Sequence, residues 1–116
     1  MVDGGEKPTN RVHIEDIAQS VLAMIERAPR GSRIYNVCDG HPHTVRELVD
    51  FLVDELDVER PEEVTLEEYA RRRGPNVAAR WKTMYRCDNQ RLLDDLGVQL
   101  RYPDAIDGYK AIFDIS

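Results

Sequence analysis

Two residues near the start of the sequence, Arg11 and His13, and a third cation beside the only tryptophan, Arg80, are the side chains best suited to bind a ligand. Arg11 and His13 are two residues apart, so on an extended strand they project from the same face. Together they can bind an acidic or hydroxyl-rich molecule. In Arg80-Trp81-Lys82, cations flank a flat aromatic ring, which suits an anion; the alternative is that Trp81 covers the core. We predict that Arg11, His13 and Arg80 contact a small-molecule substrate.

A second cluster of chemically active residues lies in a six-residue segment. It contains four candidate metal ligands, namely Cys38, Asp39, His41 and His43. Structural zinc sites usually take paired ligands from two separated places, and the other cysteine, Cys87, has no histidine beside it. We therefore interpret the segment as a polar turn after a strand and predict no metal site. A small metal-dependent hydrolase using Cys38, His41 and His43 remains the alternative.

The sequence contains no motif for catalysis or for a cofactor. Its seven glycines form neither a dinucleotide-binding fingerprint nor a phosphate-binding loop. No serine lies in a nucleophile elbow, and adjacent acidic residues on a helix point about 100° apart, so they do not converge on one substrate atom. We predict no catalytic residue and no cofactor for this chain alone.

Capping residues and apolar spacing predict four to five short helices. Asp16 is expected to cap a helix over residues 17–28, with Ile17, Val21, Leu22 and Ile25 on one face. Capping boxes at Thr44 and Thr65 open the next two helices. Asp88 caps a helix that ends at Gly97, and Asp104 caps the last one.

Three short segments rich in β-branched and aromatic residues predict strands, at residues 11–14, 33–38 and 83–87. Strands that alternate with helices favour an α/β layer arrangement. The predicted fold class is therefore α/β, with a small, mostly parallel sheet of about three short strands and four to five helices.

Length and charge limit the alternatives. The 116 residues suffice for one domain, predicted over residues 11–116 after a flexible N-terminal segment, 1–10. A net charge of −6 without a basic tail argues against nucleic acid, and no apolar run is long enough for a membrane span. Two lone cysteines fit a reducing compartment, so we expect a cytoplasmic protein.

The order of short motifs resembles the extended short-chain dehydrogenases, the NAD-dependent epimerase/dehydratase family. Residues 11–18 resemble the family's Arg-Ile-His-Val-x-Asp-Ile-Ala segment, and residues 34–37 resemble its Tyr-Asn-Val strand. Residues 88–98 are similar to its Asp-x-Ser-Lys…Leu-Gly-Trp pattern, and Arg-Tyr-Pro at 101–103 is similar to its closing segment. The match runs from about residue 6 to residue 113.

This resemblance implies the C-terminal, substrate-binding lobe of an NAD(P)-dependent nucleoside-diphosphate-sugar epimerase, dehydratase or reductase. The family's N-terminal Rossmann domain and its Tyr-x-x-x-Lys motif are not in this sequence, so we expect no catalysis by the chain alone. NAD(P) is expected in the intact family. Sugar-nucleotide members often bind the diphosphate through an arginine where this sequence has Thr9, which argues against such a ligand here.

The resemblance also suggests partners. A separate Rossmann-domain chain is expected to complete the enzyme, and a homodimer is also possible. The alternative is a non-catalytic protein-binding or dimerisation module, which would use exposed apolar surface.

Overall fold

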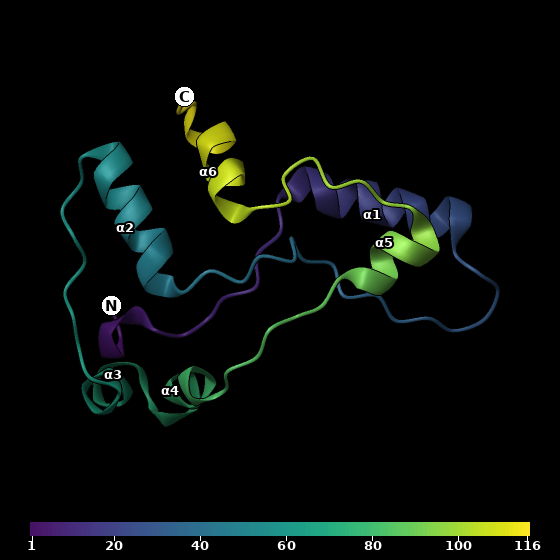
Figure 1. Ribbon diagram of the computed structural model, residues 1–116. Coiled ribbons are helices and arrows are strands. Elements are labelled where there is room, and N and C mark those ends of the chain that lie inside the picture. Colours follow the sequence, from purple (N-terminus) through teal and green to yellow (C-terminus); the bar gives the residue numbers. More distant parts are fainter. The chain divides into compact units, whose positions relative to one another are not determined.

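The computed structural model describes all 116 residues, and they form six α-helices and one short 3-10 helix joined by irregular segments (Figure 1). None of the helices has the length and apolar character needed to cross a membrane. In chain order, the elements are η1 (Asp3–Gly5), α1 (Ile14–Arg27), α2 (Val45–Leu56), α3 (Leu66–Arg73), α4 (Pro75–Lys82), α5 (Gln90–Leu96) and α6 (Ala105–Phe113).

The prediction of an α/β fold with a three-stranded sheet is wrong. The segments 11–14, 33–38 and 83–87 form no ladder with one another, and the β-type pairing is limited to two isolated bridges, Val2–Val64 and Pro8–Thr44. A strand needs an adjacent strand to take up its backbone hydrogen bonds. The residue types therefore indicated segments suited to extended backbone, but they did not indicate whether another strand would pair with each segment.

Side-chain amides connect the segment 33–38 to residues 88 and 89, which directly follow the segment 83–87. The side chain of Asn36 donates to the carbonyl of Asp88 at 3.3 Å. The side chain of Asn89 donates to the carbonyl of Cys38 at 2.9 Å. Such local side-chain bonds satisfy single backbone groups without imposing strand register.

Two compact units account for the whole chain. The first unit combines Met1–Thr9 with His43–Arg86, and the second combines Asn10–Pro42 with Cys87–Ser116. Each unit is thus built from segments far apart in the sequence. The division into a segment 1–10 and a domain 11–116 remains a prediction.

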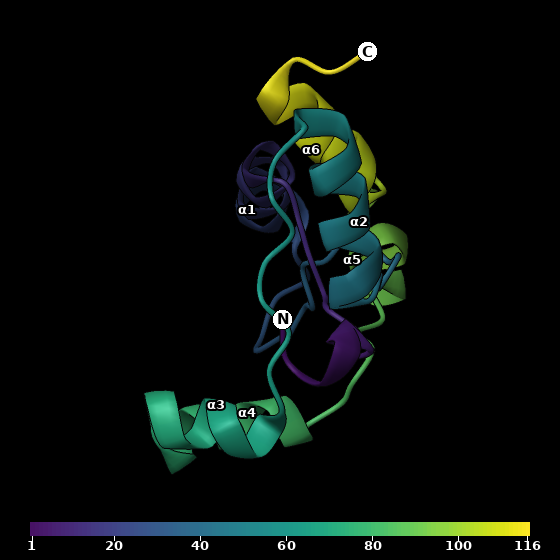
Figure 2. The same ribbon diagram turned by 90° about the vertical axis from the view of Figure 1, so that its left-hand side faces the viewer.

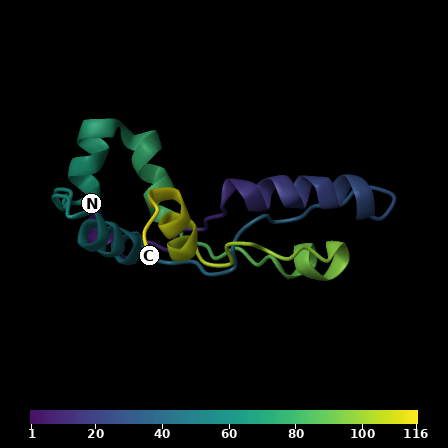
Figure 3. The same cartoon turned by 90° about the horizontal axis from the view of Figure 1, so that it is seen from above.

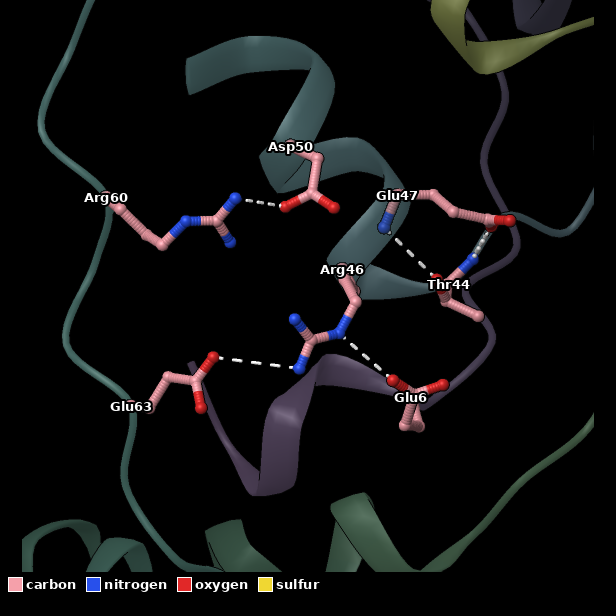
Figure 4. Close-up of polar contacts among 7 residues, drawn as sticks. All are labelled: Glu6, Thr44, Arg46, Glu47, Asp50, Arg60 and Glu63. Atoms are coloured by element: carbon pink, nitrogen blue, oxygen red, sulfur yellow. Dashed lines mark hydrogen bonds and ion pairs between the residues drawn. The ribbon is translucent and has the colours of Figure 1, made fainter. Parts of the chain in front are cut away.

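In the first unit, the N-terminal residues are fixed by backbone bonds and ion pairs. The amide of Asp3 donates to Val64, and the amide of Val64 donates to Met1, at 2.9 and 2.8 Å. The Arg46 guanidinium lies between Glu6, at 3.0 Å, and Glu63, at 3.7 Å (Figure 4). All three side chains are solvent-exposed, so each pair contributes little, and the backbone bonds do most of the fixing.

The predicted capping box at the start of α2 is confirmed. The Thr44 hydroxyl accepts from the amide of Glu47 at 3.1 Å, and the Glu47 carboxylate accepts from the amide of Thr44 at 2.7 Å (Figure 4). The bond from the Thr44 amide holds the pKa of Glu47 below its usual value, with a smaller contribution from nearby His43. The helix then runs from Val45 to Leu56, as its apolar spacing predicts.

Helix α4 was missed, because Gly74-Pro75-Asn76 has the composition of a turn. Pro75 is instead the first residue of the helix, where its missing amide N–H costs nothing and its fixed φ suits helical geometry. Helices α3 and α4 lie side by side (Figure 2), and the rings of Tyr69 and Trp81 meet edge-on at 5.8 Å. Trp81 therefore packs against its neighbouring helix.

The core of the second unit lies between α1 and α5, which run side by side (Figure 3). Ala23 of α1 is buried against Leu92 and Leu96 of α5, and Val98 completes the cluster. A small residue at position 23 lets the two helices approach closely. Partly buried apolar residues surround this cluster, namely Met24, Tyr35, Val37 and Leu100.

The most hydrophobic face of α1 does not take part in this core. We define the α1 apolar face as Ile14, Ile17, Val21, Leu22 and Ile25, whose exposed fractions range from 41% to 77%. The residues that α1 buries are Asp16, Ser20 and Ala23. The apolar stripe read from the sequence is thus a real helical face, and solvent covers it within this chain.

Replacing Tyr35 by phenylalanine should stabilise the chain. The Tyr35 hydroxyl is buried and has no hydrogen-bond partner, so folding removes it from water without compensation. Tyr35→Phe should raise the free energy of unfolding by about 1 kcal/mol, measured by urea denaturation. The exposed Thr83→Val, which also removes one hydroxyl, is the control and should change it by less than about 0.5 kcal/mol. A loss of stability in Tyr35→Phe would show that the hydroxyl is bonded.

Removing the Thr44 hydroxyl should alter the titration of Glu47. The folded-state pKa of Glu47 is lowered, so its contribution to stability is present above its unfolded pKa and is lost as pH falls through the folded value. Thr44→Ala keeps the backbone amide but removes the hydroxyl, whose bond also lowers the pKa of Glu47, so this pKa should rise part of the way toward its ordinary value. Carboxyl-detected NMR titration measures this change, with Glu67, outside the box, as the internal control. An unchanged Glu47 midpoint would contradict it.

Candidate functional site

The site begins with a buried carboxylate. Asp16 is fully buried in the first turn of α1, and its two oxygens accept from the backbone amides of Arg101, at 2.7 Å, and Tyr102, at 2.9 Å. Each bond is charge-assisted, and together they occupy both oxygens of the carboxylate. Asp16 therefore holds the segment before α6 against the start of α1.

Asp16 is not the N-cap that its position in the sequence predicted. The cap is His13, whose Nδ1 atom accepts from the amide of Glu15 at 3.2 Å, so α1 begins at Ile14. Because His13 caps the helix, the Asp16 carboxylate is free to bond outside it. The same interaction fixes the tautomer of His13: when Nδ1 accepts, the neutral ring carries its proton on Nε2 and is a donor there.

The imidazole of His13 is held between two parts of the closing segment. Its ring lies against Tyr102, with 4.1 Å between ring centroids and an interplanar angle of 42°. On the α6 side it approaches Gly108, where an added Cβ would stand 3.4 Å from the His13 Cδ2 atom. Glycine at position 108 thus allows α6 to approach the histidine closely.

Arg11 enters the site from irregular chain just before α1. Its carbonyl accepts from the amide of Asp39 at 2.7 Å, which fixes the backbone. Its guanidinium is exposed and has no carboxylate partner. By contrast, Arg101 nearby is engaged: it pairs with Glu15 at 2.8 Å and lies over the Tyr102 ring.

Arg11 and His13 line one cavity of about 210 Å³. Its remaining lining residues come from the start of α1 and from α6 with the residues before it: Val12, Tyr102, Asp104, Ala105, Gly108, Tyr109 and Ile112. The structure therefore brings two of the three predicted binding residues to one concave surface. Arg11 and His13 line this surface although the strand predicted at residues 11–14 does not form.

Sequence reasoning missed the residues that complete the cavity. Tyr102, Gly108 and Tyr109 belong to the closing segment and α6, and the sequence indicated only a helix capped by Asp104 there. The Asp104 cap, confirmed by a bond of 2.8 Å from the Ile106 amide, correctly set where α6 begins. Nothing local in the sequence signals that this helix faces His13.

The third predicted residue, Arg80, lies in the first unit, near the end of α4. Its carbonyl accepts from the Lys7 ammonium, which also lies 5.6 Å from the centre of the Trp81 ring. Its side chain is exposed. A substrate contact by Arg80 remains a prediction.

The geometry does not support the metal-dependent hydrolase. No group of three or more histidine, cysteine, aspartate or glutamate side chains is arranged to hold a metal ion. Cys38 is buried, its thiol donates to the carbonyl of Cys87 at 3.6 Å, and burial raises its pKa. A thiol so placed is less readily deprotonated than an ordinary one, whereas a metal needs the thiolate.

A dinucleotide does not fit the residues of this chain. Such cofactors bind where a strand, a glycine-rich turn and a helix follow one another at the edge of a parallel sheet. The paired glycines Gly4 and Gly5 lie in η1, against the side chains of Arg46 and Met1, and no strand leads into them. The described residues thus offer no cradle for a pyrophosphate.

No protein-family model matches the sequence, and no curated protein is significantly similar to it. Solved structures do share its fold. A functionally unknown conserved protein from Silicibacter pomeroyi matches with a TM-score of 0.78 and 27% identity, over 91% of this chain and 37% of that one. RMD from Pseudomonas aeruginosa, complexed with NADPH, matches with a TM-score of 0.68 and 22% identity, over 99% of this chain and 33% of that one.

This chain therefore spans about a third of each of these two solved structures. Similarity to the NADPH-complexed RMD, at 22% identity, is a similarity of fold. At these identities, the comparison concerns the fold and not the substrate.

Replacing Asp16 by asparagine should destabilise the second unit. Asparagine has one acceptor oxygen, so its amide group would face a backbone N–H that also donates. Asp16→Asn should lower the free energy of unfolding by about 2–4 kcal/mol, measured by thermal and urea unfolding. The exposed Asp107→Asn on α6 is the matched control and should change it by less than about 0.5 kcal/mol. Equal effects of the two substitutions would refute the assigned role of Asp16.

Proposed function

We propose that this chain is the substrate-binding portion of an NAD(P)-dependent enzyme of the epimerase, dehydratase or reductase type. The observation that carries the proposal is the cavity in which Arg11 and His13 meet, within a fold shared with an NADPH-complexed protein. In this proposal, Arg11 and His13 bind and orient the substrate. Hydride chemistry belongs to a dinucleotide-binding domain outside these residues.

The α1 apolar face supports a partner. It presents five large aliphatic side chains to solvent along one side of a helix, whereas soluble proteins rarely leave such a contiguous surface uncovered. We assign it to contact with the dinucleotide-binding domain. The same observation favours the second candidate, a dimerisation module in which two copies of the chain cover this face.

Calorimetric titration with NADPH tests the first candidate. The chain alone should give no saturable heat up to about 1 mM NADPH, because it lacks the loop and sheet that hold a pyrophosphate. Stoichiometric uptake with a micromolar Kd would overturn the proposal.

Sedimentation velocity over a range of protein concentrations separates the two candidates. If the chain is a substrate-binding portion, both the wild-type chain and the Val21→Lys variant should sediment as monomers. A dimer that Val21→Lys abolishes would instead establish the second candidate. Val58→Lys, at an exposed apolar position in the first unit, is the matched control and should leave the distribution unchanged.

A further inference from the structure

The size of the cavity limits what it can bind. At about 210 Å³, it is smaller than the roughly 300–1,000 Å³ of pockets that enclose drug-sized ligands. A molecule of three to six carbons fits this space, whereas a nucleoside diphosphate sugar would extend beyond it.

The charges that line the cavity limit the ligand further. Arg11 is the only arginine or lysine among the lining residues, and Asp104 is the only acid. A diphosphate would bring two or more negative charges toward one cation and one carboxylate. A single carboxylate, in contrast, can accept two parallel hydrogen bonds from one guanidinium. The Arg11 guanidinium forms no ion pair with an acidic side chain of the protein, so a ligand carboxylate would not have to displace one.

The remaining walls suit a ligand with one further polar group. His13 offers a neutral Nε2–H donor, because its Nδ1 accepts from Glu15. A hydroxyl or carbonyl oxygen on the ligand can accept from such a group. Val12, Ala105 and Ile112 supply apolar surface for a short carbon chain.

The geometry points to a small hydroxy- or oxo-monocarboxylate as the ligand of this cavity, in place of a sugar nucleotide. This inference rests on the proposed function, since it names the substrate class of the same site. The residues that carry it are Arg11 for the carboxylate and His13 for the second oxygen.

NMR titration of the ¹⁵N-labelled chain with glycerate tests the inference, and glycerol serves as the analogue without the carboxylate. Glycerate should shift the amides of Arg11, His13, Tyr102 and Gly108 along one saturable curve, with a millimolar Kd, as expected for a ligand of so few atoms. Glycerol and UDP-glucose should bind at least about tenfold more weakly.

Arg11→Ala should weaken glycerate binding at least about tenfold, and Arg11→Lys, which keeps the charge but loses the fork, should weaken it less. Arg27→Ala, at an exposed cation outside the cavity, is the matched control and should leave the Kd unchanged. Amide spectra establish that each variant is folded, and Arg11→Lys decides the test if Arg11→Ala is not.

Three results would overturn the inference: no saturable shift with glycerate up to about 50 mM, equal binding of glycerol, or tighter binding of UDP-glucose through the same amides. The last result would leave the proposed function intact and change only the substrate class. Failure of the proposed function itself would appear separately, as uptake of NADPH by the chain alone.

Discussion

The second unit depends on one buried carboxylate bonded to two backbone amides. Asp16 has no solvent exposure, so its charge is stabilised only by the groups that the protein places around it. Because those groups include the amides of Arg101 and Tyr102, the start of α1 and the approach to α6 are fixed together. The contact of Tyr102 with His13, and with it the cavity wall, follows from this pair of bonds.

Much of the helical structure could be predicted from capping residues, because a cap acts within one turn of chain. Thr44, Thr65 and Asp104 each accept a first-turn amide, and Gly97 ends α5 in the left-handed conformation. The absence of a sheet could not be predicted, because a strand forms only where a second segment pairs with it. Helix α4 was missed for a local reason, since a proline that starts a helix and a proline in a turn have the same flanking residues.

Arg11 and His13 were expected on one surface, but for a reason that the structure contradicts. Arg11 and His13 were paired as neighbours on a strand, and they instead meet in a cavity because His13 caps α1 and Arg11 precedes it. The opposite wall comes from residues 102–112, nearly a hundred positions later, and spacing along the chain carries no information about such a pair. The α1 apolar face is a second example. Its helical periodicity could be predicted from the sequence, but the surface that covers it could not.

The division of the chain has a consequence for the order of folding during synthesis. The chain passes between its two units three times, after residues 9, 42 and 86, so neither unit can be excised as one continuous stretch. All residues of the first unit have been synthesised once Arg86 is translated. The Asp16 carboxylate gains its first hydrogen-bond donor, the amide of Arg101, only when the chain has grown by 85 residues after Asp16 itself. At ribosomal speeds this interval is on the order of 10 s. Until then the carboxylate stays hydrated, and the first unit has the earlier opportunity to fold.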